Sequence, residues 1–281
     1  MKIVKIKSHA KLNLALNITG KTSSLHKIET IVTFAYLHDQ IFIKRIKSDK
    51  HNVVFSGKFS GNIGKNNTIS KLLNILEKKR LLKNKKFGIK VNKLIPSKSG
   101  LGGGSMNAAN ILNYFVKKKI IKVNKKKILL ISRLIGSDVI LGLKIKSSIL
   151  NEKNKIKYFS NYKKFFVLII KPDFGCSTRD IYSKVKRFNK PKFNRPTKKM
   201  FDLKYLKGMS NSLEPIVFSK YDKLRKTKLF LEKLSTPAFV RMTGSGSALV
   251  AYFQSKETCE NAKKEFIKKY KNYWCIASKT I

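Results

Sequence analysis

The sequence predicts an α+β protein of two domains, and three observations support this fold class. Strand-like and helix-like segments are mixed along the chain without the regular strand–helix–strand repeat of a doubly wound sheet. At 281 residues, 42% of them apolar, the chain can form more than one modest core. A new strand-like segment begins near residue 163. We therefore predict an N-terminal domain over residues 1–160 and a C-terminal domain over residues 161–281.

The spacing of apolar residues predicts the individual elements. Alternation or short apolar runs predict strands at residues 2–18, 31–37, 40–46, 87–94, 165–170, 238–241 and 248–253. Helical periodicity predicts helices at residues 67–82, 107–119, 125–134, 221–234 and 257–270. The second and third strands are expected to join at a turn near His38 and Asp39. Residues 189–199 are polar and contain two prolines, so we predict a loop there.

The chain is strongly basic. It has 63 Lys and Arg against 15 Asp and Glu, a formal net charge of +48. Such a balance is typical of partners of nucleic acids or anionic membranes. The lysines are spread over the whole chain, however, and other residues with AT-rich codons (Asn, Ile, Phe, Tyr) are also abundant. We interpret the charge as compositional drift, and expect non-specific polyanion binding at low salt but no specific nucleic-acid partner.

Membrane and secreted classes are not indicated. No apolar run approaches the ~20 residues of a transmembrane helix, and lysines interrupt the N-terminal segment where a signal peptide would be continuous. The three cysteines lie far apart without a CxxC pair, which argues against a zinc site and a disulfide framework. We expect a cytoplasmic protein without a membrane partner.

A glycine-rich loop lies between a predicted strand and a predicted helix. Glycines let the backbone approach an anion, and successive N–H groups with the positive end of the helix then surround it. Ser105 can donate a hydroxyl hydrogen bond, and Lys98 can add a positive charge. The alternative is a glycine-rich turn that only lets a helix pack closely. The predicted phosphate-binding residues are Pro96, Ser97, Lys98, Ser99, Gly100, Leu101, Gly102, Gly103, Gly104, Ser105 and Met106.

Standard nucleotide-binding motifs are absent. There is no GxxxxGK[ST], and Ser105 stands where the third glycine of GxGxxG would fall. Residues 173–175 spell the Asp-Phe-Gly of protein kinases, but the accompanying kinase motifs are missing, so we interpret this as a coincidence. Lys11 and Asn13 share one face of the first strand, and residues 243–247 form a second glycine turn. Alone, Lys11 would be a solvated lysine among many.

In their order along the chain, these segments resemble the motifs of the GHMP kinase superfamily. The matching segments are residues 11–13 (Lys-Leu-Asn), 100–105, 136–138 (Gly-Ser-Asp) and 243–247 (Thr-Gly-Ser-Gly-Ser). A His-x-x-x-Thr segment at residues 26–30, and Pro172 followed by Ser177 and Thr178, are similar to one branch of that superfamily. That branch phosphorylates the 2-hydroxyl of a cytidine diphosphate-linked methylerythritol in non-mevalonate isoprenoid biosynthesis.

The resemblance implies a fold and a mechanism. The implied fold has an N-terminal domain like the second domain of ribosomal protein S5 and a ferredoxin-like C-terminal domain. ATP and Mg²⁺ are the implied cofactors, with Asp138 as the catalytic base and Lys11 as its cationic partner. The chemistry suits this pair, because an aspartate can accept the substrate hydroxyl proton while a lysine keeps it ionised and offsets phosphoryl charge. Without the resemblance, Asp138 would be interpreted as a helix N-cap.

The resemblance also implies residues for the other substrate. Asn13 and Thr178 match positions near the methylerythritol unit. His26 matches a histidine that reads cytosine, and Tyr182 matches an aromatic residue that stacks on the base. Without the resemblance, His26 would be a surface-loop residue and Tyr182 a partly buried helix residue.

Two more residues and some departures complete the pattern. Asn67 and Lys93 fall where the family contacts adenine. The family usually has a tyrosine before the histidine as the other half of the cytosine sandwich, but Leu25 stands here. Leucine can contact the ring but gives up about 1 kcal/mol of stacking preference. Ile140 replaces a usual proline, and no departure removes a residue needed for phosphoryl transfer.

Two other functions remain compatible with the sequence. Another GHMP kinase, of the homoserine or mevalonate type, would keep the glycine loop but not the base-reading residues. A basic nucleic-acid-binding protein on an S5-like fold would gather basic and aromatic side chains on one exposed face and would not need Asp138. For the enzyme, we expect a monomer or a homodimer.

Overall fold

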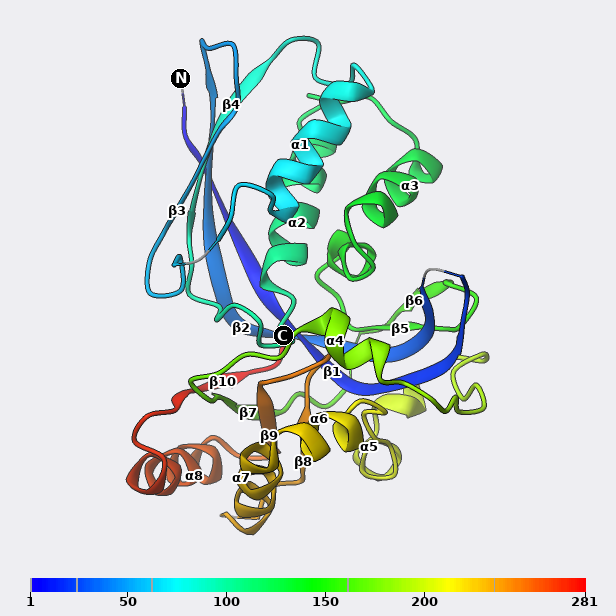
Figure 1. The fold of residues 1–281 in the computed structure, drawn as a ribbon, viewed down its shortest axis with the longest axis vertical. Coiled ribbons are helices and arrows are strands. Elements are labelled where there is room, and N and C mark those ends of the chain that lie inside the picture. The colour runs from blue at the N-terminus through cyan, green and yellow to red at the C-terminus, as the bar shows by residue number, and fades with distance from the viewer. Residues whose placement is uncertain (1, 24, 62, 161, 235) are drawn as a thin grey trace. The chain divides into compact units, whose positions relative to one another are not determined.

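The computed structural model of the protein describes residues 2–23, 25–61, 63–160, 162–234 and 236–281 and has the α+β composition that the sequence predicts (Figure 1). The chain forms two compact units. Unit 1 comprises Met1–Ala10, Leu37–Ser97 and Gly102–Ile145, and unit 2 comprises Lys11–Tyr36, Lys98–Leu101 and Lys146–Ile281. The long strands β1 (Val4–Lys21) and β2 (His26–Ile46) contribute residues to both units. The domain boundary at residue 160 stays a prediction, since compact units need not be the units that fold independently.

Unit 1 is a sheet covered by helices. Within it, the second half of β2 pairs antiparallel with β4, β4 pairs parallel with β3, and β1 also pairs with β2. Figure 1 shows α1 and α2 lying along one face of these strands. The elements of this unit are β3 (Asn52–Ser56), α1 (Thr68–Lys78), β4 (Lys86–Asn92), α2 (Gly103–Lys117), α3 (Lys125–Ile135) and the 3₁₀ helix η1 (Val139–Leu143).

The core of unit 1 follows from the predicted periodicities. Inward residues of the strands, such as Ile43 and Ile89, pack against the apolar stripes of the helices, such as Leu72, Leu112 and Phe115. All five side chains are at most 2% exposed. Burial of that kind contributes about 1.5–3 kcal/mol for each large side chain. Because the buried positions must be apolar, the alternation of the strands and the helical spacing of the helices are visible in the sequence.

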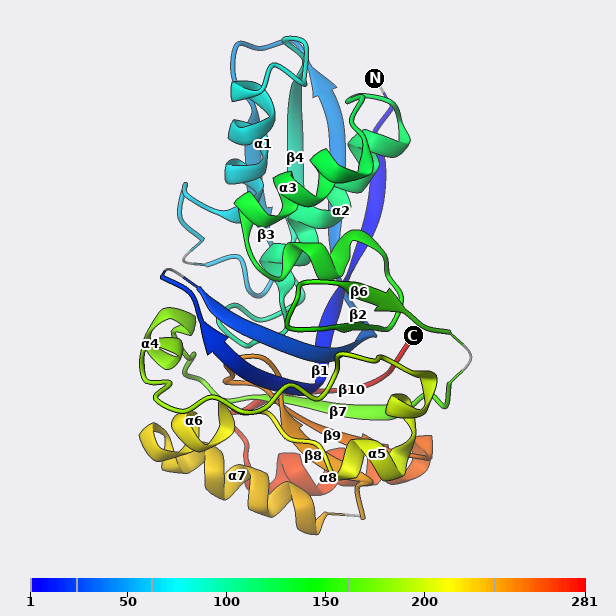
Figure 2. The same cartoon turned by 90° about the vertical axis from the view of Figure 1, so that its right-hand side faces the viewer.

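Unit 2 contains a four-stranded antiparallel sheet of order β10-β7-β9-β8. Figure 2 shows α7 and α8 on one face of this sheet. The first half of β2 also pairs antiparallel with β5, and β5 with β6. The strands of this unit are β5 (Ser148–Leu150), β6 (Ile156–Tyr158), β7 (Phe166–Lys171), β8 (Phe239–Met242), β9 (Leu249–Phe253) and β10 (Trp274–Lys279). Its helices are α4 (Thr178–Ser183), η2 (Lys198–Phe201), α5 (Leu203–Lys207), α6 (Glu214–Lys220), α7 (Asp222–Lys233) and α8 (Lys256–Lys269).

The core of unit 2 joins sheet and helices. Leu168 of β7, Leu231 of α7 and Phe266 of α8 are fully buried in one apolar cluster, to which Leu16 of β1 also belongs. An antiparallel sheet with helices packed on one face agrees with the ferredoxin-like architecture expected for this part of the chain.

Two sequence-based expectations about elements were wrong. The predicted turn near His38 does not exist, because β2 runs without interruption and Asp39 is buried within it. The Asp39 carboxylate is a buried hydrogen-bond acceptor within the strand and does not mark a turn. The helix expected to begin at Asn107 begins at Gly103, and Thr68 Oγ1 donates to the carbonyl oxygen of Gly104 at 2.7 Å. Gly103 and Gly104, which were predicted from the sequence to lie in the glycine loop, thus begin α2.

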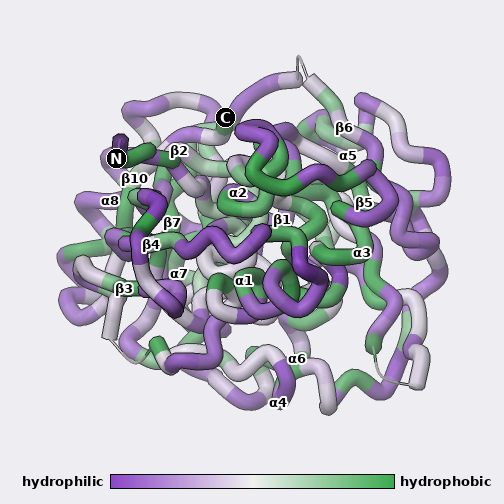
Figure 3. Tube along the Cα trace, turned by 90° about the horizontal axis from the view of Figure 1, so that it is seen from above, coloured by the Kyte–Doolittle hydropathy of each residue, from purple (hydrophilic) through white to green (hydrophobic). Residues whose placement is uncertain are grey.

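Polar residues are distributed along the whole trace. Hydrophilic stretches recur from the N-terminal strands to the C-terminal helix in Figure 3, as lysines spread over the sequence require. Among the described residues, no helix is both long enough and apolar enough to cross a membrane.

Candidate active site

Residues 98–101 of the glycine loop belong to unit 2 and are held there by backbone hydrogen bonds. The Lys11 amide donates to the carbonyl oxygen of Leu101 at 2.9 Å. The Cys176 amide donates to the carbonyl oxygen of Lys98 at 3.3 Å, and the Ala248 amide donates to that of Ser99 at 3.0 Å. Three segments that are distant in sequence therefore fix the conformation of this stretch.

Gly100 allows two glycine turns to meet backbone to backbone. Its φ is +76°, and a Cβ atom there would lie 1.9 Å from the carbonyl oxygen of Thr243. Gly244, with φ of +55°, would bring a Cβ to 3.0 Å from the carbonyl oxygen of Gly100. Only glycine fits at either position, because both the dihedral angle and the space exclude a side chain. The second glycine turn is thus part of the same structure as the first.

Lys11 lies against this loop. Although it is a lysine, it is only 1% exposed, and its Nζ donates to Asn13 Oδ1 at 2.6 Å and to the carbonyl oxygen of Gly100 at 3.2 Å. The solvated-lysine interpretation is therefore wrong for this residue. Asn13 is buried as well, and its Nδ2 donates to Thr30 Oγ1 at 2.8 Å while its Oδ1 accepts from the Gly244 amide at 2.9 Å. Asn13 thus orients the ammonium group and joins the two turns.

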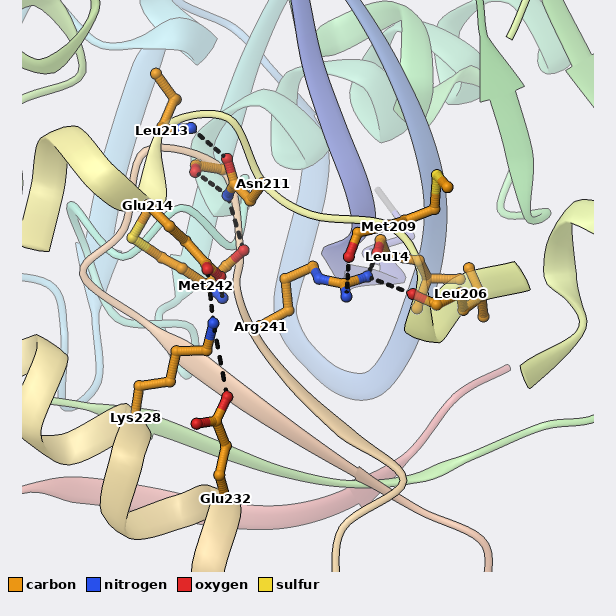
Figure 4. Close-up of polar contacts among 11 residues, drawn as sticks. Leu14, Leu206, Met209, Asn211, Leu213, Glu214, Lys228, Glu232, Arg241 and Met242 are labelled. Atoms are coloured by element: carbon orange, nitrogen blue, oxygen red, sulfur yellow. Dashed lines mark hydrogen bonds and ion pairs between the residues drawn. The ribbon is translucent and has the colours of Figure 1, made fainter. Parts of the chain in front are cut away.

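Buried polar side chains hold the strand that leads into the second turn. Asn211 Nδ2 donates to the carbonyl oxygens of Met242 and Gly244, each at 2.8 Å (Figure 4). Glu214 Oε1 accepts from the Met242 amide at 2.7 Å, and its Oε2 pairs with Lys228 Nζ at 2.7 Å. These hydrogen bonds connect Asn211 and Glu214 to the backbone on both sides of Thr243 and so help to position the turn.

Arg241 reinforces the same strand. Its guanidinium is buried and donates to three backbone carbonyl oxygens, those of Leu14, Leu206 and Met209 (Figure 4). Burial lowers the pKa of this guanidinium, while Tyr252 and Glu214 act in the opposite direction. An arginine that ties β8 to β1 explains why a charged residue occupies a fully buried strand position.

Thr178 is connected to the second glycine turn. It begins α4, it is exposed, and its Oγ1 lies 2.9 Å from Ser245 Oγ, where either hydroxyl can donate. Thr243 and Ser245 are buried. The sequence identified the turn but did not assign these two residues to the site, because their importance depends on contacts with Asn13 and Thr178 across the fold.

His26 and Tyr182 lie together, at the start of β2 and on α4. Their ring centroids are 5.2 Å apart and the planes are tilted by 49°. His26 Nε2 is buried and has no hydrogen-bond partner among the residues that the structure describes. Burial, and then the Lys21 ammonium, lowers the pKa of His26, and both effects favour the neutral imidazole. Leu25, which stands where the family usually has tyrosine, is 65% exposed.

The remainder of the glycine loop forms the N-terminus of α2 in unit 1. Gly102 occupies the N-cap position with φ of 70°, no side chain caps the helix, and its first turn carries no acidic residue. The amides of the first turn are thus not satisfied by a capping side chain, and the positive end of the helix is not neutralised locally. This arrangement fits a phosphate group.

Lys93 and Asn67, assigned to the adenine end, both have structural partners. Lys93 is 4% exposed and pairs with the fully buried Asp39, whose Oδ2 also accepts from Asn107. Asn67 caps α1, where its Oδ1 accepts from the amides of residues 69 and 70, each at 3.0 Å. The buried role of Asp39 was not predicted from the sequence, although an acidic residue within an apolar strand pattern could have indicated it.

Asp138 precedes η1 and is partly buried. It stands at the N-cap position, with φ of −80° and ψ of −13°, but its side chain makes no capping hydrogen bond. Asp138 therefore has the N-cap position that the helix-cap interpretation expects, but it does not cap η1 through a side-chain hydrogen bond.

The Asp-Phe-Gly triplet has a structural use. A Cβ atom at Gly175 would lie 2.6 Å from the Cβ of Lys98, and Ser247 Oγ donates to the carbonyl oxygen of Phe174 at 2.8 Å. The triplet therefore supports both glycine turns. Over the described parts of the chain, no group of three or more His, Cys, Asp or Glu gathers to hold a metal ion.

Comparison with known proteins places this geometry in a class. Residues 67–144 match the family described as GHMP kinases N terminal domain. A crystal structure of 4-(cytidine 5'-diphospho)-2C-methyl-D-erythritol kinase superposes with a TM-score of 0.77 at 21% identity, covering 99% of both chains. A homoserine kinase from Cytophaga hutchinsonii superposes with a TM-score of 0.71 at 14% identity, covering 100% of this chain and 95% of the other. The fold is thus that of GHMP kinases, as the sequence predicted.

Closer relatives define the family. A 4-diphosphocytidyl-2-C-methyl-D-erythritol kinase of Pelagibacter ubique (strain HTCC1062) is 54% identical over 281 residues, which is 100% of both chains. Another, from Petrotoga mobilis (strain DSM 10674 / SJ95), is 32% identical over 254 residues, covering 87% of this chain and 96% of the relative. This chain belongs to the 4-diphosphocytidyl-2-C-methyl-D-erythritol kinase family.

Proposed function

We propose that this chain uses ATP to phosphorylate the 2-hydroxyl of 4-diphosphocytidyl-2-C-methyl-D-erythritol, a step in non-mevalonate isoprenoid precursor biosynthesis. The observation that carries the proposal is the 54% identity, over the full length of both chains, with the Pelagibacter ubique kinase. The position of Lys11 supports it as well, because its buried ammonium is held by Asn13 and by the Gly100 carbonyl oxygen of the glycine loop.

We assign the chemical step to Asp138 and Lys11. Asp138 accepts the proton of the substrate hydroxyl as the hydroxyl attacks the γ-phosphorus of ATP. Lys11 offsets negative charge on the phosphoryl group in transfer, and its ammonium is already oriented by Asn13 and the Gly100 carbonyl. An oriented charge needs no reorganisation during the reaction, which is how such groups lower a barrier.

We assign phosphate binding to residues 96–106. The uncapped first turn of α2 and the absence of acidic residues there support this assignment. When bound, Mg²⁺ would neutralise charge on the β- and γ-phosphates. Asn67 and Lys93 stay assigned to the adenine end, where their side chains also have partners within the protein, Asn67 the Ile69 amide and Lys93 the Asp39 carboxylate.

We assign recognition of the second substrate to Asn13, His26, Thr178 and Tyr182. The exposed Thr178 hydroxyl is suited to a polar contact, and the orphan Nε2 of His26 is suited to the edge of a base. Asn13 uses its amide within the protein, so its contribution is to shape the site around Lys11.

A coupled assay of ADP release tests the proposal. With the cytidine substrate, Asp138→Asn is expected to lower kcat by about 10²–10⁴-fold, the range for loss of a general base. Asp222→Asn, at an exposed position of α7, is the matched control and should leave kcat unchanged. Combining Asp138→Asn with Lys11→Met should cost less than the product of the single effects, because residues that serve one step are not additive. A kcat that is unaffected by Asp138→Asn would refute the mechanism.

The same assay separates the alternatives. Homoserine and mevalonate replace the cytidine substrate in parallel reactions, and turnover of either one without turnover of the cytidine substrate would refute the substrate assignment. A nucleic-acid-binding protein would turn over none of them, and its retention on polyanions would be independent of Asp138.

We propose further that the enzyme is cytoplasmic, a monomer or homodimer, and without a specific nucleic-acid partner. Cell fractionation can check the localisation, and light scattering can check the oligomeric state.

A further inference from the structure

An exposed aromatic side chain lies beside the candidate base-reading histidine. Phe188 is 46% exposed, and its ring centroid is 6.4 Å from that of His26, with the planes tilted by 52°. Tyr182 approaches the same imidazole at 5.2 Å. Two aromatic rings from α4 and the segment that follows it therefore converge on one histidine.

The backbone next to Phe188 is anchored to β1. The Asn189 amide donates to the carbonyl oxygen of Ile18 at 2.8 Å. Asn189 Nδ2 donates to Asn17 Oδ1 at 2.8 Å and to Ser212 Oγ at 2.9 Å. The residue that follows the phenylalanine is thus tied by both its backbone and its side chain.

A buried carboxylate holds the continuation of this segment. Glu29 of β2 is fully buried, and its two oxygens accept from the amides of Lys192 at 2.6 Å and Phe193 at 3.0 Å. Asn17 Nδ2 also donates to Glu29 Oε1 at 2.8 Å. Charge-assisted hydrogen bonds of this kind are about twice as strong as neutral ones. The exposure of Phe188 is therefore a property of an anchored backbone and not of a free loop.

The surroundings of Phe188 suit a flat ligand with a polar edge. The neighbouring imidazole nitrogen, His26 Nε2, is buried and has no partner in the parts of the chain that the structure describes. A buried polar atom without a partner is destabilising unless a ligand or water satisfies it. A nucleobase can fill both needs, since its face stacks on aromatic rings and its edge forms hydrogen bonds.

We infer that Phe188 is an aromatic wall of the base-binding site and stacks on the cytosine ring of the substrate. It supplies the ring that Leu25, itself 65% exposed, does not provide at the position where the family usually has tyrosine. This inference rests on the proposed function, because it takes the cytidine group of that substrate as the ligand. Phe188 would thus compensate for leucine in place of the usual tyrosine at position 25, because it provides another aromatic side chain that contacts the base.

Kinetics and equilibrium binding of variants test the inference. The variants are Phe188→Ala, Phe188→Tyr, Phe188→Ala combined with Leu25→Tyr, and Leu229→Ala. The last is the matched control, because Leu229 is a 48%-exposed apolar residue of α7 in the same unit. KM for the cytidine substrate, KM for ATP and kcat come from ADP release, and the dissociation constants of CDP and UDP come from calorimetry.

Phe188→Ala should raise KM for the cytidine substrate and Kd for CDP about tenfold, equivalent to about 1.4 kcal/mol. KM for ATP and kcat should stay within about twofold, because a stacking contact on the base is made equally in the ground and transition states. Phe188→Tyr should retain affinity, and adding Leu25→Tyr to Phe188→Ala should restore most of it. Leu229→Ala should change none of these quantities.

The outcomes distinguish this inference from the proposed function. Normal turnover of the cytidine substrate, with KM and CDP affinity unaffected by Phe188→Ala, would overturn the inference and leave the function standing. Absence of turnover by the unsubstituted chain would overturn the function, and failure of that chain to bind CDP would overturn the inference directly. A loss of CDP affinity that Leu25→Tyr restores supports the inference, because general damage to the fold would not be repaired at that position.

Discussion

Removing the buried Asp39 carboxylate should destabilise unit 1 and loosen the backbone at Leu94 and Ile95, which leads into the glycine loop. Asp39 is fully buried and accepts from four donors: Lys93 Nζ, the Leu94 and Ile95 amides, each at 2.8 Å, and Asn107 Nδ2 at 2.9 Å. In Asp39→Asn the remaining oxygen can still accept from the two amides, but the new NH₂ group faces the ammonium. That leaves a buried charge unpaired, which costs about 3–5 kcal/mol. We expect the lower end, about 3 kcal/mol, because two hydrogen bonds survive.

Removing the other member of this ion pair, Lys93, should destabilise the protein less than Asp39→Asn does. In Lys93→Met the carboxylate keeps three of its four donors, so we expect a loss of about 1–3 kcal/mol. The double variant Asp39→Asn/Lys93→Met removes both charges and should be more stable than Asp39→Asn alone, because replacing a buried ion pair is often close to neutral. The coupling between the two sites is thus predicted to be strong.

Urea denaturation followed by far-UV circular dichroism measures these differences, with the midpoint and slope analysed together. Hydrogen exchange at the Leu94 and Ile95 amides reports the local effect, and faster exchange is expected in Asp39→Asn. Asp222→Asn removes the acidic partner of an exposed ion pair and should leave the midpoint unchanged. An Asp39→Asn variant within about 0.5 kcal/mol of the parent, or single losses that simply add in the double variant, would refute this reasoning.

Three further predictions follow from named contacts. Gly100→Ala should destabilise the fold by more than about 1 kcal/mol and raise KM for ATP, because its φ is +76° and its Cβ would meet the Thr243 carbonyl oxygen. The Cys176 thiol should react slowly with a disulfide reagent at pH 8, because burial raises its pKa to about 11 and leaves only ~0.1% thiolate. The pKa of His26 is lowered by burial and by Lys21, so its contribution to stability is present above about pH 6.5 and is lost as the pH falls through its lowered pKa. Urea midpoints measured from pH 7.5 down to pH 5 should therefore fall less in His26→Gln than in the parent.

Each of these has a control. Gly61→Ala introduces a Cβ with no neighbour within 4 Å and should be tolerated, so equal effects at both glycines would contradict the steric argument. In guanidinium the Cys176 thiol should react at once, and equally fast reaction in the native protein would show that it is not protected. An unchanged pH dependence in His26→Gln would contradict the assigned sign, since the unfolded state must bind more protons than the native state.

The sequence was informative where structure depends on local patterns. The apolar spacing of residues such as Leu72 and Leu76 identified α1, and its helical stripe is buried. The glycines at 100 and 102–104 identified the loop, and the order of short motifs identified the superfamily, since each motif is carried by consecutive residues. Asp39 was misinterpreted as part of a turn, because a polar residue in a strand pattern looks the same from the sequence whether it faces water or a buried lysine.

By itself, then, the sequence determined the α+β fold class, the glycine loop and the kinase family of this protein. Only the tertiary structure decided that Lys11 is buried against Gly100, that Thr243 and Ser245 belong to the site, and that Phe188 stands beside His26. The physical reason is range. Periodicity and glycine content act between neighbours in the chain, whereas these contacts join residues 67 to 230 positions apart, and their partners are selected by packing.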